Sequence, residues 1–156
     1  MIASELGRGA TVSIFLPVAA NLERAADAPP GEMKASRGVA RGAVLVVDDD
    51  PDVRRFIVDS LDTLGFRVIE AEDGPSGLEL FERERPDLLL LDFAMPGMNG
   101  AEVAERARRL RPGQRVLFAS GYADTAAIEQ AAGDAAVLRK PFRLTDLAAA
   151  VKGALA

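Results

Sequence analysis

Apolar and polar positions divide the chain into two patterned regions with an unpatterned stretch between them. Residues 11–17 alternate apolar and polar side chains up to Pro17, which predicts a β-strand that ends at the proline. Residues 18–42 contain Ala, Pro, Gly and charged residues without a sustained apolar period, a composition typical of a flexible linker. From residue 43 onward, apolar runs and helix-period segments alternate regularly, which predicts one folded domain over 43–156.

Short apolar runs in this region predict five strands, at 43–47, 66–70, 88–91, 116–119 and 136–138. Amphipathic segments predict five helices, at 52–64, 75–85, 100–110, 124–132 and 145–155. The residues expected to face inward are Val53, Phe56, Ile57, Leu61 and Leu64, then Val103, Ala104, Ala107 and Leu110, then Leu147, Ala148, Val151 and Leu155. Continuous apolar strands alternating with helices predict an α/β fold, a doubly wound five-stranded parallel sheet with helices on both faces.

Polar side chains follow four of the five predicted strands. In an open parallel sheet the ligand site lies at the carboxyl ends of the strands, so these residues are expected to converge. They are Asp48, Asp49 and Asp50 after the first strand, Asp92 after the third, Ser120 after the fourth and Lys140 after the fifth. Converging carboxylates repel unless a cation neutralises them, and Mg²⁺ prefers such oxygen ligands. Lys140 and Ser120 suit a tetrahedral anion, which makes Asp92 a candidate nucleophile for an acyl phosphate.

Each of these residues also has an ordinary structural explanation when it is taken alone. Acids between a strand and a helix suit an N-cap, which applies to Asp48, Asp49 and Asp50. Asp92 and Ser120 suit turns, and a lysine such as Lys140 is usually a solvated surface residue. Their joint position at the ends of successive strands favours a phosphate-handling site over these separate explanations.

Composition removes several other classes of chemistry and location. The chain has no Cys and no His, so its 156 residues can form no disulfide, provide no imidazole for catalysis and carry no phosphohistidine. A net charge of −5 argues against a nucleic-acid-binding surface. No apolar stretch reaches the roughly 18 residues that a membrane-spanning helix needs, so we expect no membrane contact and a cytoplasmic location.

Residues 43–156 resemble the receiver domain of two-component response regulators. The resemblance rests on four motifs in the family's order and spacing: Val-Leu-Val-Val-Asp48-Asp49, Leu-Leu-Leu-Leu-Asp92-Phe-Ala-Met-Pro96-Gly-Met-Asn-Gly100, Phe-Ala-Ser120-Gly and Leu-Arg-Lys140-Pro141-Phe142. It implies a flavodoxin-like fold and a signalling domain, not an enzyme with turnover, that catalyses its own phosphotransfer and dephosphorylation. The expected donor is a histidine kinase or a histidine phosphotransfer domain, and the face built from residues 124–155 is expected to carry signalling contacts and self-association.

The resemblance also assigns site residues. Asp92 would be the phospho-acceptor. Asp48, Asp49 and Asp92 would hold Mg²⁺ or Mn²⁺ together with the backbone carbonyl of Ala94, with Asp49 favoured as the direct ligand. The phosphoryl group would be bound by Ser120, as the switch hydroxyl, and by Lys140.

Three further positions bear on how the switch works. Tyr122 and Ala94 would line the mouth of the site, although an exposed loop aromatic is an equal explanation for Tyr122. The family often carries an aromatic residue three positions before the lysine, where this chain has Val137. That departure leaves the coupling between Ser120 and an aromatic switch in question.

Residues 1–17 resemble another family, the sensor histidine kinases. Glu5-Leu6-Gly7-Arg8-Gly9 and the strand that ends at Leu16-Pro17 are similar to the last glycine box and final strand of the kinase ATP-binding domain. An ordinary glycine turn before a strand is the alternative. The resemblance implies that this chain is the C-terminal receiver of a hybrid histidine kinase, with residues 1–17 a remnant of the kinase domain and residues 18–42 the linker.

Two functions of other classes compete with the receiver interpretation. A haloacid-dehalogenase-type phosphatase also uses an Asp nucleophile and Mg²⁺, and Asp48-x-Asp50 superficially fits its motif. Asp52, however, stands where that family has Thr or Val. A flavin- or nucleotide-binding module would need a glycine-rich phosphate cradle, which the strand ends lack.

Overall fold

The computed structural model describes residues 2–5, 9–12, 41–121, 133 and 135–156. The chain divides into two compact units, Met1–Ser36 and Arg37–Ala156. In the first unit, β1 (Ile2–Glu5) and β2 (Gly9–Val12) form an antiparallel hairpin in which Ile2 pairs with Val12. The strand predicted over 11–17 therefore begins two residues earlier, and it has a partner that the sequence pattern did not indicate. Residues 13–17 and the predicted linker up to residue 40 lie outside the described part of the chain.

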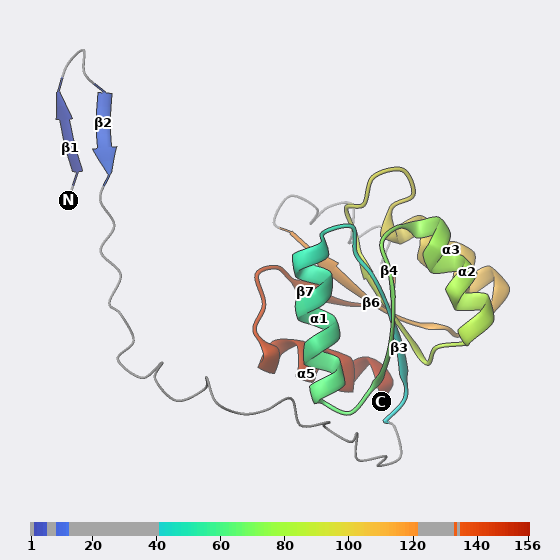
Figure 1. Cartoon of the computed structure of the whole chain (residues 1–156). Helices are drawn as coiled ribbons and strands as arrows, with labels where there is room; N and C mark the ends of the chain where they lie inside the picture. Colours follow the sequence, from blue (N-terminus) through green and yellow to red (C-terminus); the bar gives the residue numbers. More distant parts are fainter. Residues whose placement is uncertain (1, 6–8, 13–40, 122–132, 134) are drawn as a thin grey trace, which may run out of the picture. The chain divides into compact units, whose positions relative to one another are not determined.

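The second unit is built on a five-stranded sheet with the order β4-β3-β5-β6-β7, and every neighbouring pair is parallel (Figure 1). The strands are β3 (Ala43–Val47), β4 (Arg67–Ala71), β5 (Leu88–Asp92), β6 (Arg115–Ser120) and β7 (Ala136–Arg139). All five lie within one residue of the predicted bounds. The central strands β3 and β5 are buried along their whole length, which explains their unbroken apolar sequences. The predicted α/β fold is confirmed.

Helices cover both faces of this sheet. The described helices are α1 (Pro51–Thr63), α2 (Gly74–Glu84), α3 (Gly100–Leu110) and α5 (Leu144–Leu155). Figure 1 shows α1 and α5 on one face and α2 and α3 on the other. The helix predicted over 124–132 lies outside the described residues.

Each face has its own core. Leu45, Val47, Leu89, Leu91 and Phe118 pack with α2 and α3, whereas Val44, Val46, Leu88, Leu90 and Leu117 pack with α1 and α5. Neighbouring residues of one strand thus serve opposite cores, as the alternation of side chains along a strand requires.

Two residues predicted to face inward do not. Phe56 on α1 is 44% exposed and Leu110 on α3 is 57% exposed. Phe56 lies at the margin of its helix, where its ring contacts Phe142 at a centroid distance of 6.1 Å instead of entering the core. Leu110 is the last residue of α3, and Ala107 is the last α3 residue buried in the core cluster. An apolar stripe on a helix therefore extends beyond the surface that the sheet can cover.

The topology determines where a site can lie. From β3 the chain crosses to β4 on one side, and β5 then pairs with β3 on the other side. The carboxyl ends of β3 and β5 are thus adjacent, with Val47 paired with Leu91. Ligand sites in open parallel sheets form at such a reversal of strand order, and Asp48 and Asp92 are the next residues along the two strands.

Candidate functional site

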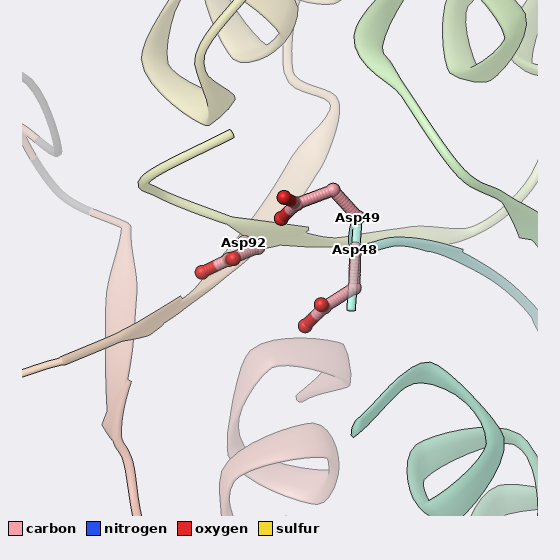
Figure 2. A group of neighbouring side chains, drawn as sticks. All are labelled: Asp48, Asp49 and Asp92. Atoms are coloured by element: carbon pink, nitrogen blue, oxygen red, sulfur yellow. The ribbon is translucent and has the colours of Figure 1, made fainter. Parts of the chain in front are cut away.

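Three carboxylates meet at the carboxyl ends of β3 and β5 (Figure 2). Asp48, Asp49 and Asp92 each offer an oxygen atom, and these oxygens all lie within 4.8 Å of one another. Asp48 is fully buried and Asp92 is 7% exposed, whereas Asp49 is exposed. The convergence predicted from the strand ends is therefore present in the structure. Asp50 does not belong to this cluster, because its side chain caps α1 by accepting hydrogen bonds from the N–H groups of Asp52 and Val53.

The most buried carboxylate, that of Asp48, is held at both oxygens. Its Oδ1 accepts a hydrogen bond from the N–H of Asp50 at 3.0 Å, and its Oδ2 lies 2.9 Å from Nζ of Lys140. Burial raises the pKa of Asp48 above its ordinary value, although Lys140 opposes that shift. Asp48 is thus fixed in place, and the exposed carboxylate of Asp49 is the more available to an incoming ligand.

Lys140 bridges the two buried carboxylates. Its Nζ lies 2.9 Å from Oδ2 of Asp48 and 3.1 Å from Oδ1 of Asp92. Burial alone would lower the pKa of Lys140, but the hydrogen bond and charge of Asp48, together with Asp92, outweigh it and raise the pKa above 10.5. The lysine is therefore a cation that stands directly beside Asp92, and its backbone N–H donates to the carbonyl of Ser120 at the end of β6.

The remaining predicted residues lie around this centre. Ser120, at the end of β6, is buried, and its Oγ donates to the carbonyl of Gly121 at 2.9 Å. Ala94 is exposed, two residues after Asp92. Val137, which replaces the aromatic residue common in the family, is 38% exposed on β7. Tyr122 lies outside the described residues.

The turn that carries Asp92 depends on a close backbone approach at Gly100, the first residue of α3. A Cβ atom added at Gly100 would overlap the carbonyl oxygen of Asp92, and the N–H of Gly100 donates to the carbonyl of Phe93 at 3.1 Å. Only glycine permits this packing of α3 against the end of β5. The pattern of apolar positions gives no signal for such a role, because it arises from two backbones that meet.

Residues 44–152 match the family described as the response regulator receiver domain, and the chain belongs to this family. Among curated relatives, the response regulator receiver protein CpdR of Brucella abortus is 41% identical over 67% of this chain and 88% of its own length. The sensor kinase CckA of the same organism is 36% identical over 96% of this chain, which spans 17% of the kinase. A solved receiver domain protein from Clostridium thermocellum has a TM-score of 0.68 and 26% identity over 72% of this chain and 93% of its own.

These findings confirm the predicted class, a receiver domain of the kind that acts in phosphorelay signalling. They give no support to the haloacid-dehalogenase alternative, and the geometry agrees, because Asp50 serves as a helix cap. No helix in the described part of the chain is long and apolar enough to span a membrane.

Proposed function

We propose that this receiver domain accepts a phosphoryl group from a phosphohistidine onto Asp92 in a reaction that depends on Mg²⁺. The observation that carries the proposal is the placement of Asp92 at 3.1 Å from the Lys140 ammonium and within the cluster of three carboxylates. The chain contains no His, so the donor histidine belongs to a kinase or phosphotransfer domain outside these 156 residues.

The residues present fit a hard divalent cation. Asp48, Asp49 and Asp92 offer only oxygen donors, and three anionic groups so close together favour a cation between them. Asp49 and Asp92 would hold Mg²⁺ or Mn²⁺ directly, with Asp48 and the Ala94 carbonyl completing the set. Both oxygens of Asp48 already have partners, which favours Asp49 as the direct ligand. The bound cation would neutralise negative charge on the phosphoryl oxygens and on the carboxylates.

The step itself is a displacement at phosphorus. A carboxylate oxygen of Asp92 attacks the phosphorus atom, the P–N bond to the donor imidazole breaks, and the electron pair remains on the imidazole nitrogen, which takes up a proton from solvent. Lys140 donates a hydrogen bond to a phosphoryl oxygen while the carboxylate of Asp92 is converted to an acyl phosphate. The same residues then support hydrolysis, in which water attacks the phosphorus, the P–O bond to Asp92 breaks, and inorganic phosphate leaves as the carboxylate of Asp92 is restored.

Ser120 provides the conformational response. Its hydroxyl donates to the carbonyl of Gly121 rather than to Asp92. A phosphoryl oxygen on Asp92 is a stronger acceptor than a backbone carbonyl, so we expect the hydroxyl to leave the carbonyl of Gly121 and rotate towards the phosphoryl group. Self-association through the 124–155 face remains a prediction, because residues 124–132 and 134 of that face lie outside the described part of the chain. Cytoplasmic location likewise remains a prediction.

The donor domain would dock on a groove lined by Lys140, the residue whose ammonium lies beside Asp92. The groove has a volume of about 530 Å³ and runs from Lys140 and Pro141 to the exposed Phe56 and its neighbour Phe142. Because a phosphohistidine must approach within bonding distance of Asp92, the surface beside Lys140 has to contact the domain that carries it. Phe56→Ala should slow phosphotransfer from a histidine donor while labelling by a small phosphodonor stays at the native rate. Equal slowing of both reactions would contradict docking at this groove.

The sequence shared with CckA supports a hybrid kinase as the parent protein. That similarity covers 96% of this chain and so extends beyond the 44–152 receiver match towards the N-terminus. Residues 1–17 would then be a remnant of the ATP-binding domain and residues 18–42 a linker to the receiver. The sequence encoded immediately upstream tests this arrangement, because a hybrid kinase requires the rest of an ATP-binding domain there.

Intact mass measurement tests the proposed reaction. After incubation with a small phosphodonor and Mg²⁺, the native protein should gain one labile phosphoryl group, and excess chelator should prevent the gain. Asp92→Asn should gain none. A phosphoryl group that still forms in Asp92→Asn with the native yield would refute Asp92 as the acceptor.

A further inference from the structure

Arg54 on α1 is tied to the acidic turn after β3. Its Nη1 donates a hydrogen bond of 2.6 Å to the backbone carbonyl of Asp48. Its Nε lies 3.4 Å from Oε2 of Glu70 on β4, so the guanidinium connects two strands. The side chain is only 16% exposed, although it is a cation on a surface helix. A charged donor on a carbonyl makes one of the stronger hydrogen bonds available to a main-chain group.

The carbonyl of Asp48 belongs to the peptide unit that leads into Asp49. Fixing that carbonyl fixes the plane of the peptide and so places the N and Cα atoms of Asp49, from which its side chain extends. The other contacts of the turn hold Asp48 itself, through its N–H to Ala71, through Asp50 and through Lys140. The Arg54 hydrogen bond acts on the peptide before Asp49, and the hydrogen bond from the N–H of Asp50 to Oδ1 of Asp48 acts on the peptide after it.

We propose that Arg54 is a positioning residue that sets the orientation of the Asp49 carboxylate for cation binding by holding the Asp48 carbonyl. The inference rests on the proposed function, because it concerns the cation that Asp49 and Asp92 would share. Arg54 touches neither the cation nor the phosphoryl group. It acts through the backbone of the turn, as groups behind the metal ligands do in other metal sites.

The sign of the effect separates this role from a simple effect of charge. A guanidinium close to a cation site repels the cation, so removal of its charge alone should tighten Mg²⁺ binding. Loss of a positioning contact should weaken it. Arg55 is the matched control, because it is the next residue of the same helix and carries the same charge, but its side chain is 83% exposed and its Nε lies 4.0 Å from Oδ2 of Asp59.

The experiment is a calorimetric titration of Mg²⁺ into the native protein, Arg54→Met, Arg54→Lys and Arg55→Met at one ionic strength. Methionine keeps the aliphatic stem and removes the donors. We expect Arg54→Met to bind Mg²⁺ about tenfold more weakly, at the low end of the range for the loss of groups behind metal ligands. Arg54→Lys, which keeps the charge but has a shorter reach, should fall between native and Arg54→Met. Arg55→Met should bind as tightly as native or more tightly.

An Arg54→Met protein that binds Mg²⁺ as tightly as native, or more tightly, would refute the positioning role, even if its unfolding free energy is lower. If Arg54→Met does not fold, the Mg²⁺ affinity of Arg54→Lys tests the proposal instead. Native affinity in Arg54→Lys would refute the positioning role, because it would mean that the longer guanidinium side chain is not needed. A native protein that binds no Mg²⁺ at all would instead overturn the proposed function. The two failures are therefore distinguishable.

Discussion

The two ends of the parallel sheet use their polar groups differently. At the amino ends of the strands, Oδ2 of Asp87 accepts a 2.7 Å hydrogen bond from the N–H of Ala43, and Gln114 Nε2 donates to the carbonyl of Asp87 at 3.3 Å. At the carboxyl ends, Asp48 and Asp92 share the ammonium of Lys140, and the carboxylate of Asp49 lies in the same cluster. One end joins neighbouring segments of the backbone by side-chain hydrogen bonds, whereas the other gathers three negative charges that one lysine does not balance.

This difference separates stability from function within one sheet. A side chain that is hydrogen-bonded to the main chain already has its partner, so it is not available to bind a ligand. A cluster of carboxylates is costly until a cation neutralises it, and groups whose pKa values are perturbed in this way tend to mark functional sites. Substitutions at the amino ends should therefore change the stability of the fold, and substitutions at the carboxyl ends should change both stability and phosphoryl chemistry.

Lys140→Met should have the largest effect on stability. It leaves Asp48 fully buried beside Asp92 without the cation that both contact. We expect the unfolding free energy to fall by about 2–3 kcal/mol in chelator, somewhat below the cost of breaking a fully buried pair because the lysine side chain is 22% exposed. Urea unfolding measures the change, with the exposed Lys152→Met as the matched control. A loss no larger than that of the control would contradict the account of this end of the sheet.

Gly100→Ala should come next in size. The new methyl group would overlap the carbonyl oxygen of Asp92, so α3 or the turn after β5 must move. We expect a loss of about 2 kcal/mol, typical of overpacking, together with slower labelling at Asp92. Gly153→Ala on α5 is the control, since nothing lies within 4 Å of the added Cβ, and it should raise stability by about 0.5–1 kcal/mol. Equal effects at the two glycines would exclude a special role for Gly100.

Asp87→Ala tests the amino end of the sheet. The N–H of Ala43 loses the acceptor at 2.7 Å, which should lower the unfolding free energy by about 1 kcal/mol. Because Asp87 lies at the opposite end of β5 from Asp92, the yield of labelling by a small phosphodonor should remain native. If Asp87→Ala has the native unfolding free energy but a low yield of labelling, the proposed division between a stabilising amino end and a functional carboxyl end of the sheet is wrong.

The smallest effect concerns the pH dependence of the α2 cap. The side chain and backbone N–H of Ser76 hold the pKa of Asp73 below its ordinary value of 3.8. A lowered pKa means that the carboxylate contributes stability above 3.8, and that this contribution disappears as the pH falls through the folded-state pKa. Asp73→Asn keeps an acceptor oxygen without the charge. Native protein should therefore exceed Asp73→Asn in unfolding free energy at about pH 6, and the difference should shrink towards the acid limit of folding. A difference that grows on acidification would refute the cap assignment.

The sequence predicted the strand ends well, because a parallel sheet imposes continuous apolar runs and an abrupt change to polar residues where each run stops. Asp48, Asp92, Ser120 and Lys140 could be recognised on that basis. Phe56 and Leu110 were wrongly expected to face inward, because helical periodicity gives the direction of a residue but not the extent of the surface beneath it. The four-residue strand β1 is too short to show an alternating pattern, so the partner of β2 could not be foreseen.

Arg54 and Gly100 illustrate what the sequence could not give. Arg54 acts on a carbonyl six residues earlier, and Gly100 on a carbonyl eight residues earlier, through contacts that exist only once a helix has packed against a strand end. Gly100 ends the motif that contains Asp92, but neither that motif nor the helical period shows which backbone atoms the two residues would meet. Such residues are found from the distances in a folded structure.

Direct localisation of the phosphoryl group tests the central claim. The native protein would be phosphorylated with a small phosphodonor and Mg²⁺ and then treated with borohydride, which reduces an acyl phosphate to an alcohol and so converts the modified aspartate to homoserine. Peptide sequencing by mass spectrometry should find homoserine at position 92. Homoserine at position 48 or 49, with Asp92 unchanged, would contradict the assignment of Asp92 as the residue that carries the phosphoryl group.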